Sequence, residues 1–373
     1  MEEVEDPMDE WFFNSFKKYH KLQMFGIDKP ILAMDLSSTT AVCLACKQSE
    51  NTVFEVLNLE LPNKLYQLEN EPDSINTSRD LKIKCGTLTT NKLIDMKTIF
   101  NKNKVILSKE GMNNVILYQL NTNNSDQMIP IISFDSKIDS GKLAINHLND
   151  TFIVWGRENT WQNGKLFDIE NNKCLLVCKD ELNDATNNYV PQFISKDKLI
   201  VLNSNNGAFD MYCITNNQHI INIPQPEANM AKWFSNTAYV NLEETTSNNF
   251  QIISNAGDLV VYDLRCLRTP KIYKRNLFPE CNNDININLD PGNLKRTVVS
   301  GFDENVYIIE EESSGDENVK LKFKHEGHLF IESEYSSHNK ITTSCALWLP
   351  MCGDNTLLSS ANNGSIQGWQ YIS

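Results

Sequence analysis

A short pattern recurs seven times along the chain. Each copy is an apolar strand, a turn rich in Asn, Gly and Asp, and a second apolar strand. The apolar residues alternate or run in short blocks of Val, Ile, Leu and aromatic side chains, so each copy predicts a β-hairpin and none has helical spacing. The copies are Ala41–Leu59, Lys104–Leu120, Phe152–Glu170, Leu199–Ile214, Phe250–Arg265, Arg296–Glu310 and Thr356–Gln370.

The spacing of the copies predicts the blades of a propeller. Turn glycines of successive copies, such as Gly207 and Gly257, lie roughly 50 residues apart, slightly more than the ~40–45 residues of a WD blade. We therefore predict an all-β fold, a seven-bladed WD40 β-propeller over residues 29–373. A short N-terminal α-helix and a ring-closing strand are expected in residues 1–28. The last copy ends at the third strand of its blade, and Leu22–Ile27 is expected to supply the outer strand.

The last copy carries the fullest WD-repeat signature. Gly327-His328 is followed by Ser359, by the turn Asn363-Gly364 and by Trp369. In WD blades such a His, Ser, Asp and Trp form a hydrogen-bonded chain, and Asn363 stands here where Asp is usual. We predict a structural network of His328, Ser359, Asn363 and Trp369, without the charge-assisted bond that Asp would add.

The segment before the first strand predicts a helix of about four turns. Asp6 is placed as its N-cap and Pro7 as its first residue. Trp11, Phe12, Phe16 and Tyr19 form an apolar stripe along it. The stripe either packs on the rim of the propeller or docks into a groove of a partner, and both readings stay open.

Composition narrows the classes of function. The net charge of -14 disfavours direct binding to nucleic acid and to anionic lipid. The N-terminus is acidic, unlike a secretory signal, and no stretch approaches the ~18 apolar residues of a membrane span. The ten cysteines are scattered through the chain, which is typical of reduced thiols. A cytoplasmic protein without disulfides is expected.

Few residues suggest a catalytic, metal-binding or phosphate-binding role. Cys43-x-x-Cys46 lies on an expected strand, where residues three apart face opposite sides and cannot hold one metal ion. His325-x-x-His328 has metal-like spacing, but His328 is already assigned to the blade network. No glycine-rich phosphate loop is present. We expect no catalytic, cofactor-binding or metal-ligating residues, and no cofactor.

Two further motifs have an alternative interpretation. Tyr262-Asp263-Leu264-Arg265 is similar to the Trp-Asp-x-Arg element by which some propellers attach to the cullin-4 ubiquitin ligase adaptor, although an ordinary strand end explains it as well. The acidic run 310–317 contains Ser313 and Ser314 as phosphorylation candidates, and is otherwise a solvated connection.

Longer blocks show a more specific resemblance. They are DEWFFNSFKKYHKL near the start, RDLKIKCG (Arg79–Gly86), SGFDENVYI (Ser300–Ile308), FKHEGHLFI (Phe323–Ile331), and ITTSCALWLP with TLLSSANNGSIQGW near the end. Because these blocks occur in the right order across nearly the whole chain, the chain resembles the WD repeat-containing protein 73 family of WD-repeat propellers. The part from about Asn121 to Asn249 matches only as generic blades.

The resemblance implies a function and partners. It implies a non-enzymatic cytoplasmic scaffold that binds subunits 9 and 11 of the Integrator RNA endonuclease and supports assembly of that module, hence snRNA processing. A HEAT-repeat protein similar to BRAT is implied as a further partner, and a monomer is expected outside such complexes. The family is also linked to spindle poles and microtubules. Alternatives are a cullin-4 substrate receptor, a spindle scaffold and, third, a propeller hydrolase. For partner binding, the candidate residues are Trp11, Phe12, Phe16 and Tyr19.

Overall fold

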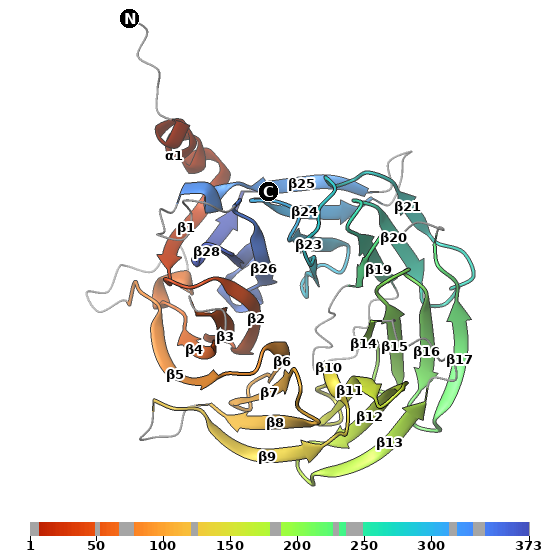
Figure 1. Ribbon diagram of the computed structural model, residues 1–373. Helices are drawn as coiled ribbons and strands as arrows, with labels where there is room; N and C mark the ends of the chain where they lie inside the picture. Colours follow the sequence, from red (N-terminus) through yellow and green to blue (C-terminus); the bar gives the residue numbers. More distant parts are fainter. Residues whose placement is uncertain are drawn as a thin grey trace, which may run out of the picture.

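Seven four-stranded antiparallel sheets surround a central axis (Figure 1). The computed structural model describes residues 7–48, 53–66, 78–120, 126–179, 188–226, 231–235, 249–312, 319–330 and 340–372. Each predicted repeat forms the second and third strands of one blade, as Ala41–Leu59 does with β3 and β4. The prediction of a seven-bladed β-propeller with a short N-terminal helix is confirmed.

In the first six blades, the strands follow the chain from the axis to the rim. Blades 1 to 3 consist of β2 (Ile31–Ser38), β3 (Ala41–Lys47), β4 (Phe54–Glu60) and β5 (Lys82–Thr89); β6 (Leu93–Ile99), β7 (Lys104–Lys109), β8 (Asn114–Gln119) and β9 (Ile129–Asp135); and β10 (Asp139–Asn146), β11 (Thr151–Glu158), β12 (Trp161–Asp168) and β13 (Lys173–Lys179). Blades 4 to 6 consist of β14 (Tyr189–Phe193), β15 (Lys198–Asn203), β16 (Phe209–Cys213) and β17 (Gln218–Ile223); β18 (Trp233–Ser235), β19 (Asn249–Ser254), β20 (Leu259–Asp263) and β21 (Ile272–Lys274); and β22 (Asn286–Leu289), β23 (Arg296–Ser300), β24 (Val306–Glu311) and β25 (Val319–His325). Short 3-10 helices lie at η1 (Asn63–Leu65), η2 (Gly327–Phe330) and η4 (Pro350–Cys352).

The seventh blade joins the two ends of the described chain. Its strands β26 (Thr343–Trp348), β27 (Thr356–Ala361) and β28 (Ser365–Tyr371) are completed on the rim by β1 (Tyr19–Gly26). Tyr19 is opposite Tyr371 and Gly26 is opposite Ser365. The residues expected to supply this strand, Leu22–Ile27, therefore lie in β1 except for Ile27. The edge of β28 is covered because β1 pairs with it.

A close approach of backbones extends this closure. Ile27 N donates to Gly364 O at 2.9 Å. Gly364 has a φ of +83°, and a Cβ there would overlap the carbonyl oxygen of Ile27. The turn between β27 and β28 therefore needs glycine for two reasons: its backbone is left-handed, and the incoming chain leaves no room for a side chain.

The core is divided among the blades. Seven clusters of buried apolar side chains within the described residues fill the seven interfaces between neighbouring sheets. The interface of blades 7 and 1, for example, contains Leu358 and Ile366 from one sheet with Ile31 and Leu44 from the other. Each blade buries its two faces only against its neighbours, so an unclosed ring would expose two apolar faces.

The N-terminal helix α1 (Pro7–Lys18) is shorter than expected. It has 12 residues and ends at Lys18 because Tyr19 already belongs to β1. The expected N-cap, Asp6, lies outside the described residues. Among the described helices, none has the length and apolar character needed to cross a membrane.

Candidate functional site

The signature residues of blade 7 form one hydrogen-bonded chain. Trp369 Nε1 donates to Ser359 Oγ at 2.9 Å, and Ser359 Oγ lies 2.8 Å from His328 Nε2. His328 Nδ1 lies 2.7 Å from Ser365 Oγ, which donates to Asn363 Oδ1 at 2.7 Å. Because Ser365 donates onward, it accepts from a protonated Nδ1, and Nε2 then accepts from Ser359. Every member of the chain has a partner.

Ser365 was not foreseen from the sequence. It lies between His328 and Asn363, so the amide side chain of Asn363 is linked to the imidazole through the serine hydroxyl. Asn363 Nδ2 also donates to the carbonyl oxygen of His328 at 3.3 Å. In the sequence, the only sign that Ser365 belongs to the network is its position, two residues after Asn363 of the turn. These contacts place the network in the interior of blade 7, away from any surface.

We expect His328→Ala to destabilise the fold by about 1–3 kcal/mol, because the buried Ser359 and Ser365 each lose one of their hydrogen-bond partners. Chemical denaturation would measure the loss. His219→Ala is the matched control, since His219 lies on the surface of blade 4 and bonds Asp210 there. A His328→Ala protein with wild-type stability and impaired partner binding would show instead that this residue belongs to an interface.

The same histidine predicts a pH dependence. Burial lowers the pKa of His328 from 6.5 to about 3, so the folded state binds fewer protons than the unfolded state below pH 6.5. Its contribution to stability is full above pH 6.5 and is lost as the pH falls towards 3, at a slope of ~1.4 kcal/mol per pH unit. Denaturation midpoints measured from pH 7 to 5 should fall, and His328→Asn should show a shallower slope. An equal slope in that variant would contradict the assignment.

A second buried contact fixes the start of β1. Tyr19 Oη lies 2.8 Å from His325 Nδ1, and the His325 ring stacks on Trp369 at a centroid distance of 4.4 Å. Tyr19 also packs edge-on against Phe323. Beside it, Lys18 Nζ pairs with Glu326 at 3.3 Å. These contacts tie the end of α1 to blades 6 and 7.

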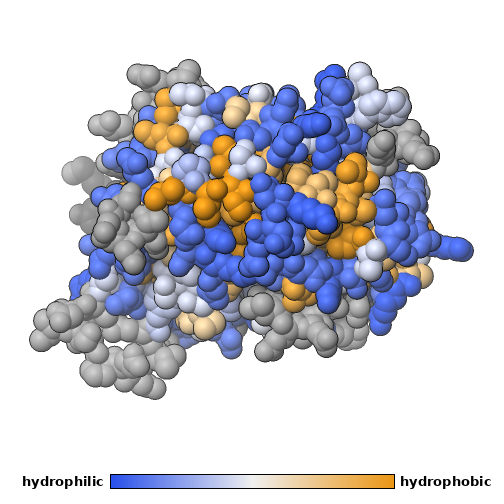
Figure 2. Space-filling model, turned by 90° about the horizontal axis from the view of Figure 1, so that it is seen from below, coloured by the Kyte–Doolittle hydropathy of each residue, from blue (hydrophilic) through white to orange (hydrophobic). Residues whose placement is uncertain are grey.

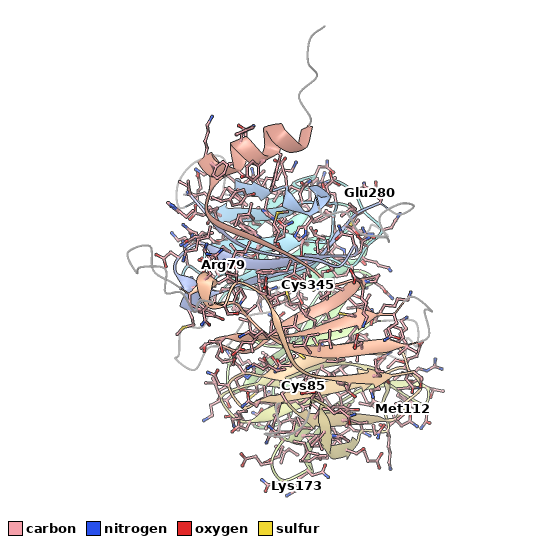
Figure 3. The ribbon with its side chains drawn as sticks, turned by 90° about the vertical axis from the view of Figure 1, so that its left-hand side faces the viewer. Arg79, Cys85, Met112, Lys173, Glu280 and Cys345 are labelled. Atoms are coloured by element: carbon pink, nitrogen blue, oxygen red, sulfur yellow. The ribbon has the colours of Figure 1, made fainter. Side chains whose placement is uncertain are left out.

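Helix α1 turns its aromatic side chains towards solvent. Phe12, Phe13 and Phe16 are exposed by 52%, 68% and 67%, whereas Ser15 is buried against the propeller. The rings of Phe12 and Phe16 lie 5.1 Å apart. Figure 3 shows α1 at one end of the molecule, standing outside the sheets. We call Phe12, Phe13 and Phe16 the aromatic face.

The expected stripe is therefore rearranged. Phe12 and Phe16 lie on the aromatic face together with Phe13, which the spacing had not indicated. Trp11 is half-buried, and Tyr19 is buried in β1, so Tyr19 was wrongly grouped with the exposed residues of the helix. The physical reason is the bond from Tyr19 to His325, which draws the chain into the sheet one residue after Lys18.

Other apolar side chains are exposed on the rim of blades 2 and 3. Figure 2 looks onto this rim and shows apolar patches between hydrophilic side chains. Ile129 and Ile131 extend from β9, and Leu175 and Val177 extend from β13, each exposed by 39% to 47%. These four residues, named the rim patch, lie across the ring from α1 (Figure 1). Exposed apolar groups on two sides of one molecule suit a scaffold.

The residues of the two motifs considered for metal binding take part in other contacts. Cys43 packs between blades 1 and 2, and Cys46 packs between blades 7 and 1, on the opposite face of β3. The rings of His325 and His328 lie 5.4 Å apart at right angles, each in its own contacts. No group of three or more His, Cys, Asp or Glu residues in the described part of the chain could hold a metal ion.

The two remaining motifs are placed only in part. Tyr262 is 2% exposed in the interface of blades 4 and 5, and Arg265 pairs with Asp263 two residues away at 2.6 Å. Ser313 and Ser314 of the acidic run lie outside the described residues. The Trp-Asp-x-Arg likeness therefore consists of one buried core residue and one local surface ion pair.

Known proteins resemble the chain along its whole length. The Integrator complex assembly factor WDR73 of Danio rerio is 24% identical over 377 residues, covering 98% of this chain and 97% of that protein. The protein of the same name from Homo sapiens is 20% identical over 395 residues, covering 98% of both. The chain is a divergent relative of WD repeat-containing protein 73. No protein-family model matches it. The end-to-end coverage places the aromatic helix and all seven blades within the region shared with these WD repeat-containing protein 73 relatives.

Proposed function

We propose that the chain is a non-enzymatic assembly factor for the Integrator RNA endonuclease. The observation that carries the proposal is the end-to-end similarity to two proteins named Integrator complex assembly factor. The proposed partners are endonuclease subunits 9 and 11, bound in the cytoplasm, with a HEAT-repeat protein similar to BRAT as a third component. The proposed consequence is supply of the assembled endonuclease for snRNA processing.

The aromatic face is the proposed contact with these partners. Its three phenylalanines are exposed while the polar Ser15 is buried, the reverse of the arrangement that an isolated helix of a monomer prefers. An apolar helix face fits a hydrophobic groove of a partner, and aromatic side chains often dominate the free energy of such contacts. Helix α1 contacts β1, and its last residue, Lys18, contacts Glu326 and Ile372, so the helix presents this face without disturbing the blades.

Binding is proposed to be direct rather than bridged by RNA. The net charge of -14 opposes a phosphate backbone, so a protein interface accounts better for association with an RNA-processing enzyme. The alternative of a cullin-4 substrate receptor receives less support, since Tyr262, its leading residue, is buried between two blades.

The test is affinity purification of the tagged full chain from nuclease-treated cytosol, followed by mass spectrometry. We expect subunits 9 and 11 to be recovered together, and the purified subunits to bind the purified chain without RNA. Recovery of the cullin-4 adaptor in their place would support the alternative. Loss of the endonuclease subunits on nuclease treatment would contradict direct binding.

A further inference from the structure

A cavity lies on the propeller axis. It measures about 260 Å³ and is lined by the innermost strand of every blade, from β2 through β26. A water molecule needs only ~10–15 Å³ of such space, so the cavity has room for a larger guest. Leu32, Met34 and Leu347 contribute apolar side chains to the wall of the cavity.

Three polar side chains of the wall come from neighbouring blades. Lys97 on β6, His147 at the end of β10 and Gln192 on β14 come from three consecutive blades. We find no hydrogen bond or ion pair for any of them among the described residues. Gln192 is only 7% exposed, and its Oε1 is buried without a partner. Buried polar groups are almost always satisfied, so the unpaired Gln192 Oε1, facing the same cavity as Lys97 and His147, calls for a ligand.

The neighbouring carboxylates, by contrast, have structural roles. Asp35 Oδ2 accepts from the Thr98 backbone at 2.7 Å and ties blade 1 to blade 2. Asp95 Oδ2 accepts from the Leu143 backbone at 2.8 Å and ties blade 2 to blade 3. Each aspartate thus holds the innermost strand of the next blade.

The charges of the residues that line the cavity indicate which chemical class of ligand it binds. Burial alone would lower the pKa of Lys97, but the carboxylates of Asp95 and Asp35 outweigh burial and raise it, so Lys97 is charged. Burial lowers the pKa of His147, which is therefore neutral at pH 7. The lining holds three carboxylates, of Asp35, Asp95 and Asp284, which repel an anion. A cation is repelled by the ammonium of Lys97 and cannot accept a hydrogen bond from it. An uncharged polar group avoids both repulsions.

We propose that the axial cavity binds an uncharged carboxamide. Its carbonyl oxygen accepts from Lys97 Nζ, and its amide group pairs with the amide of Gln192, which presents a donor and an acceptor side by side. The neutral imidazole of His147 adds one more donor or acceptor, and the apolar wall holds the aliphatic part. Such a carboxamide comes from an Asn or Gln side chain of a partner loop, or from a free small molecule.

The test uses three blocked amino acids on the full chain. They are N-acetylglutamine methylamide, its glutamate counterpart and the lysine analogue, with binding measured by saturation-transfer NMR. We expect the uncharged glutamine compound to bind at least tenfold more tightly than either charged compound. Failure of the glutamine compound to bind, or equal binding of the isosteric glutamate compound, would overturn the proposal.

Variants locate the site and separate it from the proposed function. Lys97→Met and Gln192→Leu should each weaken binding of the glutamine compound tenfold or more, while Lys102→Met, a surface lysine paired with Asp150, should not. Two variants are used so that the site can still be tested if one of them fails to fold. Undiminished binding in both folded variants would refute the site.

A second arm identifies the source of the carboxamide. If it is a partner loop, the glutamine compound in excess and Lys97→Met should both reduce capture of partners by the folded chain. If it is a free small molecule, capture stays normal while compound binding is lost. The NMR measurement involves no Integrator protein, so its outcome is independent of the assembly function.

Discussion

Deletion of residues 1–28 is expected to give a protein that aggregates, or that melts on the order of 10 °C below the full chain. The deletion removes β1 and with it the antiparallel partner of β28. It also empties the site of the buried Tyr19, which packs edge-on against Phe323, His325 and Trp369. An unpaired edge strand and an opened aromatic core act together, so the effect should exceed that of any single substitution described here.

Circular dichroism melts and light scattering would measure this loss. The matched control is deletion of residues 1–6, which leaves α1 and β1 intact and should change neither reading. Tyr19→Phe gives a milder version, because it keeps the ring and removes the hydroxyl with its hydrogen bond to His325, with an expected cost of ~1 kcal/mol or more. A soluble 1–28 deletion with an unchanged melting temperature would contradict ring closure by β1.

Phe12→Ala combined with Phe16→Ala should weaken binding to the endonuclease pair by a hundredfold or more. Truncation of an aromatic anchor at an interface typically costs ~2 kcal/mol or more, and ~1.4 kcal/mol corresponds to tenfold. Both side chains are exposed in the free chain, so the fold should keep its melting temperature. Titration with purified subunits 9 and 11 by calorimetry would measure the change.

The rim patch supplies the control for this experiment. Ile129→Ala with Ile131→Ala removes two apolar side chains of similar exposure on the far side of the ring and should leave endonuclease binding unchanged. If instead the rim variant loses binding and the helix variant keeps it, the aromatic face is not the docking surface. If both variants bind normally, neither the aromatic face nor the rim patch is the docking surface.

The blades could be predicted because their signals are local. Alternating apolar residues around an Asn-Gly turn, as in Asn363-Gly364, specify a hairpin within some 15 residues. In the structure, Gly364 has the left-handed backbone that glycine favours, and the close approach of Ile27 leaves no room for a side chain there. Recurrence of the pattern then gives the number of blades without any knowledge of tertiary contacts.

The end of α1 was missed because its cause is distant in sequence. Spacing places Tyr19 on the same stripe as Phe12 and Phe16, and only the partner His325, on β25, shows why it leaves the helix. Phe13 was missed for a related reason. Its exposure depends on which side of α1 meets the blades, and Ser15 rather than the most apolar stripe takes that position.

The polar cluster of the axial cavity has no sequence signature. Lys97, His147 and Gln192 lie on three separate blades, and only closure of the ring brings them to one space. Each resembles an ordinary strand residue in its own repeat. A site built from one residue per blade is therefore invisible to motif searches that depend on short spacing.

Pairing of β1 with β28 also orders events during protein synthesis. β1 is synthesised before its partner strand, which follows ~350 residues later, so β1 cannot be ordered by this pairing until those residues have been made. Helix α1 is anchored through that strand and through the contact of Lys18 with Ile372. The aromatic face is thus held in its final orientation only on molecules whose seventh blade has formed, which restricts productive docking to chains in which β28 has paired with β1.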